Sequence, residues 1–126
     1  MPLTELNHFT VRTDDMDGTR DFYTSVLGLA VGPRPDLGFP GYWLYCGKTP
    51  VVHLVPASAG IGAGAGPDTG NFDHVAFLGD DFDGMRRHFR ELRLPFKENH
   101  VASANIRQLF LADPNKVMIE INFQGA

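Results

Sequence analysis

The chain has little that would fix its structure covalently or attach it to a large charged partner. It contains a single cysteine among 126 residues, so it cannot form an internal disulfide. It has no run of about 18 apolar residues for a membrane span and no signal-peptide pattern near its start. Basic residues do not dominate, because the chain has 11 Lys and Arg residues and 15 Asp and Glu residues, which gives a formal charge of −4. We therefore expect a cytoplasmic protein with no membrane partner and no nucleic-acid partner, since no basic surface is available for phosphates.

Apolar residues are plentiful by contrast. They make up 43% of the chain and include ten phenylalanines, which is enough for a core at this length. We predict one domain, residues 1–126, built from a first module of about residues 4–57 and a second of about residues 71–124. The Gly-rich segment 58–70 is interpreted as the linker between them. Its Gly-x-Gly-x-Gly run lacks the Lys-Ser/Thr and the following helix that a phosphate-binding loop requires.

The two modules repeat one pattern. With a shift of 66 positions, His8 aligns with His74, and an Asp-Asp-x-Asp-Gly segment aligns with its counterpart without a gap. A register one residue longer places His53 opposite Glu120. Each module therefore carries a histidine near its start and a metal-capable side chain near its end.

Both modules are predicted to contain one strand, one helix and three further strands. Alternating apolar residues favour the opening strands, and short carboxylates before a glycine favour helix starts. Gly28 and Pro95 are typical of the positions where helices end. The expected strands are residues 6–12, 29–32, 42–46, 51–55, 72–78, 96–98, 106–111 and 117–123, and the expected helices are residues 18–27 and 84–92.

Alternation in the opening strands separates the histidines from the apolar residues. It places His8, Thr10 and Arg12 on one face, whereas the apolar face must pack on the following helix. If the modules pair about a pseudo-twofold axis, four side chains are expected to converge on the face away from the helices. They are His8, His53, His74 and Glu120. Two histidines and a carboxylate suit Zn²⁺, Ni²⁺, Mn²⁺ or Fe²⁺ and leave positions open for a substrate.

Each of these residues also has a plainer interpretation. A lone histidine on a strand is usually a core or surface residue that has found a hydrogen bond. The repeat weighs against this, as does the inward position predicted for Glu120, because a buried unpaired carboxylate needs a cation. Arg12 is expected to bind an anionic substrate group or to pair with an aspartate. His100 is expected in a loop at residues 99–103, on the surface.

Three segments of the chain together resemble one known family. They are Leu6-Asn-His-Phe-Thr-Val-Arg12, Phe72-Asp-His-Val-Ala-Phe77 and Phe110-Leu-Ala-Asp-Pro-Asn-Lys-Val-Met-Ile-Glu120. They resemble the vicinal oxygen chelate superfamily, and the similarity covers almost the whole chain. It implies an α+β fold of two paired βαβββ modules that form a cup-shaped mixed β-sheet with helices outside, around one divalent metal ion.

The resemblance also implies residue roles and a partner. The family's metal ligands correspond to His8, His74 and Glu120, and its variable fourth ligand position corresponds to His53. The family further implies a small-molecule substrate and a homodimer, in which the modules pair either within one chain or between two chains.

The favoured activity is that of a metal-dependent lyase or isomerase similar to glyoxalase I. Such an enzyme would bind vicinal oxygens of its substrate at the metal and abstract a carbon-bound proton, with Glu120 or His53 as the base. Thr10, Arg12 and Trp43 are the candidate substrate-binding residues. The fourth ligand of glyoxalase I is a Glu rather than a His.

Three alternatives stay open. An extradiol-type ring-cleaving dioxygenase would use Fe(II) and the same three ligands, but its catalytic Tyr is Phe110 here. A metal-free drug-binding module of the bleomycin-resistance type would typically lack the ligand set. Fosfomycin-resistance transferases share the Leu-Asn-His-Phe-Thr segment and rank lower.

Overall fold

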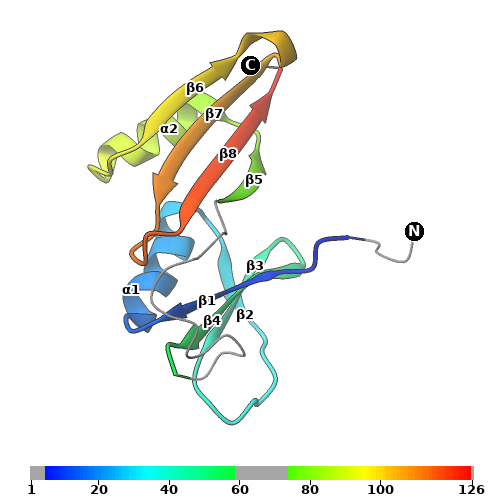
Figure 1. Ribbon diagram of the computed structural model, residues 1–126, viewed down its shortest axis with the longest axis vertical. Coiled ribbons are helices and arrows are strands. Elements are labelled where there is room, and N and C mark those ends of the chain that lie inside the picture. The colour runs from blue at the N-terminus through cyan, green and yellow to red at the C-terminus, as the bar shows by residue number, and fades with distance from the viewer. Residues whose placement is uncertain (1–4, 59–73, 126) are drawn as a thin grey trace. The chain divides into compact units, whose positions relative to one another are not determined.

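The structure is a computed structural model that describes residues 5–58 and 74–125. The chain divides into two compact units, Met1–Pro67 and Asp68–Ala126, and each unit is described by itself (Figure 1). Most of the predicted linker 58–70 and the first two residues of the predicted strand 72–78 lie outside the described residues. The single domain stays a prediction.

Unit 1 is a four-stranded mixed sheet with one helical segment. Its elements are β1 (Phe9–Thr13), α1 (Met16–Asp21), the π-helical turn η1 (Phe22–Val26), β2 (Ala30–Gly32), β3 (Tyr42–Cys46) and β4 (Thr49–Pro56). The strand order is β1-β4-β3-β2. The first strand is parallel to β4, and the other pairings are antiparallel.

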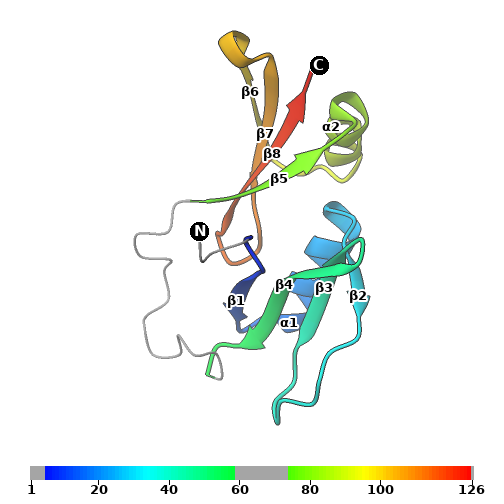
Figure 2. The same ribbon diagram turned by 90° about the vertical axis from the view of Figure 1, so that its right-hand side faces the viewer.

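Unit 2 has the same plan (Figure 2). Its elements are β5 (Val75–Gly79), α2 (Phe82–Glu91), β6 (Lys97–Val101), the 3₁₀ turn η2 (Ala102–Ala104), β7 (Ile106–Ala112) and β8 (Met118–Gln124). The strand order is β5-β8-β7-β6, with β5 parallel to β8. Two mixed sheets of order βαβββ confirm the predicted α+β fold class. Over residues 5–58 and 74–125, no helix is long and apolar enough to cross a membrane.

The repeated acidic segment forms two helix N-caps. Asp15 accepts a hydrogen bond of 3.0 Å from the backbone N–H of Gly18, and Asp81 accepts one of 3.0 Å from Gly84. A Cβ on Gly18 or Gly84 would stand 2.2 or 2.1 Å from the capping carboxylate. The Asp-x-x-Gly spacing therefore lets the capping carboxylate approach the backbone of the first helical turn closely. The repeat at these positions serves helix capping.

Both helices begin earlier than the predicted 18–27 and 84–92. They start at Met16 and Phe82, directly after the capping aspartates. The carbonyls of those aspartates already accept the first helical hydrogen bonds, 3.0 Å in each case. The residue after a cap is therefore already helical. The first helix then widens into η1 before Gly28, whose φ of 80° suits a glycine-type helix end.

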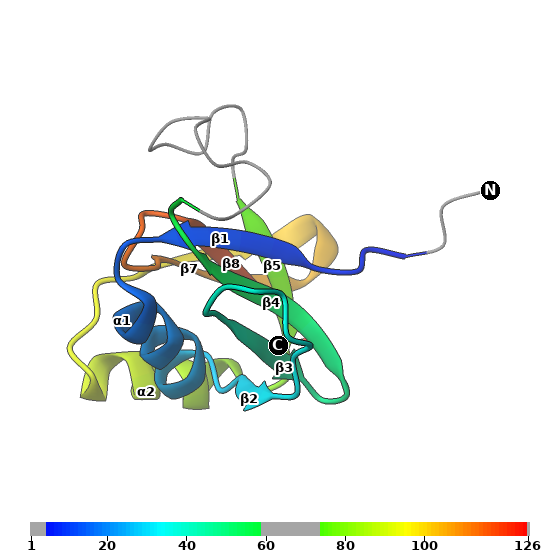
Figure 3. The ribbon, with the colours of Figure 1, turned by 90° about the horizontal axis from the view of Figure 1, so that it is seen from below.

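In each unit the helix lies on one side of the sheet (Figure 3), and contacts between helix and sheet show that apolar side chains fill the space between them. In unit 1, α1 contacts β4, and in unit 2 the ring of Phe82 stands edge-on to that of Phe123 at 5.4 Å. The repeat-equivalent Tyr23 and Phe89 are both fully buried. The buried apolar sheet residues are Val11, Leu44, Val52, Leu54 and Val55 in unit 1 and Leu109, Leu111, Ile119, Ile121 and Phe123 in unit 2. Alternation directs the side chains between these residues, including His53 in unit 1 and Glu120 in unit 2, to the opposite face of each sheet.

Three predicted boundaries are wrong in ways that affect the candidate site. The opening strand begins at Phe9 and not at residue 6, so His8 lies in the segment before β1. Strand β4 begins at Thr49, because the turn at Gly47 (φ 62°) is tight enough for Thr49 to pair with the end of β3. His100 lies in β6 rather than in a loop, because β6 pairs with β7 along all of its residues, from Lys97 to Val101 beside η2.

Candidate functional site

Three aromatic rings form a column on the face of unit 1 that lies opposite the core. The ring of His53, on β4, lies 3.7 Å from that of His8 and 4.1 Å from that of Trp43, measured between centroids. The ring planes differ by only 12° and 9°. Strand register produces the column, because His53 pairs with Trp43 on β3 and with Thr10 on β1. Thr10 therefore lies beside the column.

Hydrogen bonds set the tautomer of both histidines. His8 Nδ1 lies 2.7 Å from Asn7 Oδ1, and since an amide oxygen only accepts, Nδ1 donates and Nε2 keeps its lone pair. His53 Nε2 donates to the Pro50 carbonyl at 3.1 Å and leaves the lone pair on Nδ1. Burial and the neighbouring His8, with a smaller contribution from Arg34, lower the pKa of His53 despite this hydrogen bond. His53 is therefore neutral at neutral pH.

The stacking limits how unit 1 can bind a metal. An imidazole binds an ion in the plane of its ring, along the nitrogen lone pair. Two nearly parallel rings whose centroids lie 3.7 Å apart do not share a plane in which one ion could bind both. In this arrangement one ion can therefore bind either His8 or His53, and the exposed His8, with Nε2 available, is the better ligand. His53 is held between two rings instead.

A histidine and a carboxylate meet in unit 2. His74 Nε2 lies 3.5 Å from Glu120 Oε1, and the Glu120 side chain is only 14% exposed. The parallel pairing of β5 with β8, which sets Ala76 beside Glu120, brings His74 to this position. Nitrogen and oxygen ligands at about 2.0–2.2 Å from one small cation stand roughly 3.0–3.5 Å apart. The pair therefore fits two ligands of one divalent ion.

Three amides extend from Glu120 across the sheet of unit 2. Asn122 donates to Glu120 Oε2 at 2.8 Å, Gln108 donates to Asn122 at 3.0 Å, and Asn99 donates to Gln108 at 2.8 Å. We call Asn99, Gln108 and Asn122 the amide ladder. Sequence reasoning missed it, because it depends on the register between β6, β7 and β8. The available signal was confined to two of the amides, since Gln108 precedes the buried Leu109 and Asn122 lies between the buried Ile121 and Phe123.

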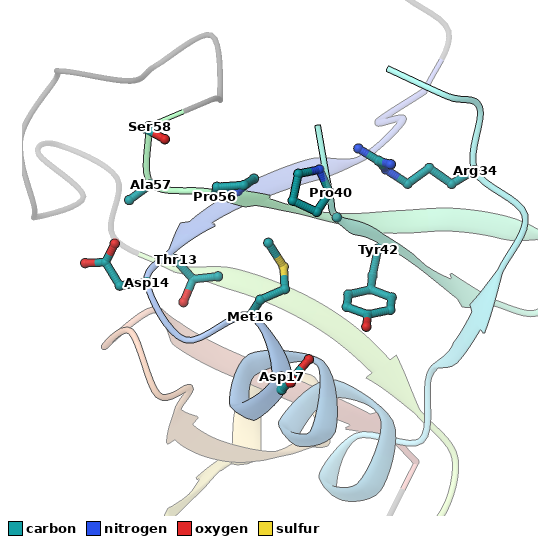
Figure 4. A pocket seen from close by; sticks show the side chains of 11 residues that line it. Thr13, Asp14, Met16, Asp17, Arg34, Pro40, Tyr42, Pro56, Ala57 and Ser58 are labelled. Atoms are coloured by element: carbon teal, nitrogen blue, oxygen red, sulfur yellow. The ribbon is translucent and has the colours of Figure 1, made fainter. Parts of the chain in front are cut away.

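A pocket of about 700 Å³ lies at the C-terminal ends of β1 and β4 (Figure 4). Thr13, Met16, Arg34 and Tyr42 are among its lining residues, and none of the four predicted ligands is. Arg34 Nη2 donates to the Phe39 carbonyl at 2.9 Å. Its buried Nε has no hydrogen-bond partner among the described residues. Because Arg34 also lowers the pKa of His53, it adds positive charge near the ring column, which sequence reasoning missed.

The four predicted ligands form two pairs, His8 with His53 in unit 1 and His74 with Glu120 in unit 2. Across the described part of the chain, no three His, Cys, Asp or Glu side chains gather closely enough to hold a metal ion. Arg12 lies half-buried on β1, where its register partner is Val55.

Comparisons with known proteins agree with this architecture. Residues 5–121 match the sequence model of the Glyoxalase/Bleomycin resistance protein/Dioxygenase superfamily. Glyoxylase I 4 of Arabidopsis thaliana is 30% identical over 126 residues, which cover 94% of this chain and 70% of that protein. The solved lactoylglutathione lyase from Agrobacterium tumefaciens has a TM-score of 0.71 at 20% identity, over 98% of this chain and 96% of that one. TnmS3, an antibiotic binding protein from Streptomyces sp. CB03234, has a TM-score of 0.75 at 17% identity, over 99% of both chains. The two structures show a shared fold.

Proposed function

Because the chain belongs to the Glyoxalase/Bleomycin resistance protein/Dioxygenase superfamily, we propose that it is a metal-dependent enzyme of the glyoxalase type. It would remove a carbon-bound proton from a small substrate that carries two adjacent oxygens. The observation that carries this proposal is the His74–Glu120 pair, a largely buried carboxylate 3.5 Å from a ring nitrogen. A divalent ion of Ni, Zn, Mn or Fe would balance the charge of Glu120, and His8 Nε2 would be a further ligand.

The bound ion would polarise the substrate oxygens as a Lewis acid. We assign the base to His53 rather than Glu120, since Glu120 Oε2 already accepts a hydrogen bond from Asn122. His53 would take the proton at Nδ1, because its Nε2 is held by Pro50. The resulting imidazolium would lie flat over Trp43, 4.1 Å away, where a cation–π interaction stabilises it. Thr10, Arg12 and Trp43 would contact the substrate.

Metal content tests the proposal directly. Protein purified without chelator and without a metal-binding tag should hold about one equivalent of Ni, Zn or Mn by elemental analysis. His74→Ala and Glu120→Gln should lose it, because each removes one member of the pair, and such losses weaken metal sites by at least about 10–100-fold. His100→Ala, an exposed histidine on β6, is the matched control. If metal is found, the metal-loaded protein is assayed with 2-oxoaldehyde–thiol adducts. If the protein holds no metal after reconstitution with Ni, Zn, Mn and Fe, the proposal is wrong.

The ring column favours a second candidate, a metal-free module that binds a planar drug. The evidence for this candidate is the parallel stacking of His8, His53 and Trp43. A flat aromatic ligand could stack on these rings in the same parallel geometry. The single tryptophan of the chain reports on this surface. This candidate is supported over the enzyme by two results together. Planar antibiotics quench the fluorescence of Trp43 in chelator-treated protein, and the metal-loaded protein shows no catalysis.

Iron as the bound metal would favour a ring-cleaving dioxygenase instead. That reading is weaker, because Phe110, which pairs with Glu120 in the sheet, has no hydroxyl to move a proton. We also propose a homodimer and a cytoplasmic location. Light scattering during gel filtration measures the dimer, and a monomer mass at micromolar concentration would exclude it.

A further inference from the structure

The amide ladder crosses three neighbouring strands of unit 2. Asn99 on β6 pairs in register with Gln108 on β7, and Gln108 pairs with Asn122 on β8. The strands lie side by side in this order in Figure 1. Asn99 is exposed, Gln108 and Asn122 are half-buried, and Glu120 is 14% exposed. The ladder therefore starts in solvent and ends at Glu120, whose side chain is largely buried.

The carboxylate sets the direction of every hydrogen bond in the ladder. An ionised Glu120 can only accept, so Asn122 must turn its NH₂ group toward it. The oxygen of Asn122 then faces Gln108, which must also present NH₂, and the same reasoning orients Asn99. Only one assignment of the amide oxygens and nitrogens satisfies all three contacts. Hydrogen bonds aligned in one direction polarise one another, and such a network is stronger than its separate pairs.

We propose that Asn122, and through it Gln108 and Asn99, are positioning residues that fix the orientation of the Glu120 carboxylate. The ladder occupies Oε2 and leaves Oε1 on the side of His74 Nε2, 3.5 Å away. Glu120 thus presents one oxygen, not two, to a bound cation. This inference rests on the proposed function for the identity of that cation, but the orientation of the carboxylate is a property of the protein itself.

The orientation is measured first in metal-free protein, by NMR of the side-chain NH₂ groups. Glu120→Leu removes the terminal acceptor. The NH₂ resonances should shift most for Asn122, less for Gln108 and least for Asn99. Gln124, which lies on the same strand and face but outside the ladder, should stay unchanged. An unchanged Asn122 resonance would overturn the inference, whatever metal the protein binds.

The consequence for the site is measured as the dissociation constant for Co²⁺, obtained by chelator competition, together with the visible spectrum of the bound ion. Asn122→Leu should weaken binding by about 10–100-fold, which is typical for the partner of a ligand. Gln108→Leu should weaken it less. The double variant should bind like Asn122→Leu alone, because Gln108 acts through Asn122.

Gln124→Leu is the matched control and should keep the wild-type constant, and thermal unfolding confirms that each variant is folded. If Asn122→Leu does not fold, Gln108→Leu with its control decides. The inference is refuted if folded Asn122→Leu binds Co²⁺ with the wild-type affinity. If that variant does not fold, the same result in Gln108→Leu refutes it. Either result leaves the proposed function standing. If the wild-type protein binds no metal, the proposed function fails, and the NMR shifts alone decide whether the ladder orients Glu120.

Discussion

Among single residues, His53 is a candidate for two competing roles, fourth metal ligand and general base. The structure favours the base, because the ring lies parallel to that of His8 and donates Nε2–H to Pro50. We predict that His53→Phe, which retains a ring in the column and removes both nitrogens, keeps metal affinity within about 3-fold while kcat falls by about 10²–10⁴. Isothermal titration with Zn²⁺ and a proton-transfer assay measure the two effects.

Trp43→Phe is the control for a disturbed column, since it alters a ring that carries no base. It should lower kcat far less than His53→Phe does, because a Phe ring still offers its face to the imidazolium. Loss of metal from His53→Phe would instead make His53 a ligand and return the base role to Glu120.

The residue types of the site were predictable from sequence, whereas their contacts were not. The repeat identified His8, His53, His74 and Glu120 as special because each occupies a corresponding position in a second copy. The stacking of His8 on His53 depends on a segment that precedes β1, and both tautomers depend on the neighbouring Asn7 and Pro50. Such contacts follow from backbone geometry that no periodic pattern contains.

For the helices, we predict that Asp15 and Asp81 contribute equally as caps. Each accepts a hydrogen bond from a glycine N–H in the first turn. Asp15→Ala and Asp81→Ala should each lower the free energy of unfolding by about 1 kcal/mol, measured by urea denaturation. The adjacent Asp14 and Asp80 are exposed, so their replacement by Ala should change it by less than about 0.5 kcal/mol. Equal losses at all four positions would point to general charge effects instead of capping.

The order and type of the elements were predictable, and their ends were less so. Alternation and helical spacing indicated the opening strands and both helices, because burial on one face imposes a period, and aromatic content indicated the strand at residues 42–46. The ends depend on turn geometry. Gly47, with φ 62°, lets β4 start at Thr49, and Asn105, with φ 53°, closes the turn that extends β6 through His100. The left-handed conformation of Asn105 is a property of one residue, which a periodic pattern does not report.

At the scale of the whole molecule, the question is whether the two halves of the repeat serve one ion. A His–carboxylate pair alone offers two ligands, whereas catalytic sites for these metals use three or more protein ligands. The ion that we propose at His74 and Glu120 would therefore need a further ligand, and the repeat aligns His74 with His8 in the first module. We predict that the chain binds one equivalent of Zn²⁺, and that His8→Ala and His74→Ala each abolish stoichiometric binding at micromolar protein. Two independent sites would give a different result, with two equivalents in the wild type and one in either variant. Competition with a coloured chelator distinguishes these stoichiometries, with His100→Ala again binding as the wild type does. Retention of full Zn²⁺ affinity in His8→Ala would confine the ion to the second unit and remove His8 from the proposed ligand set.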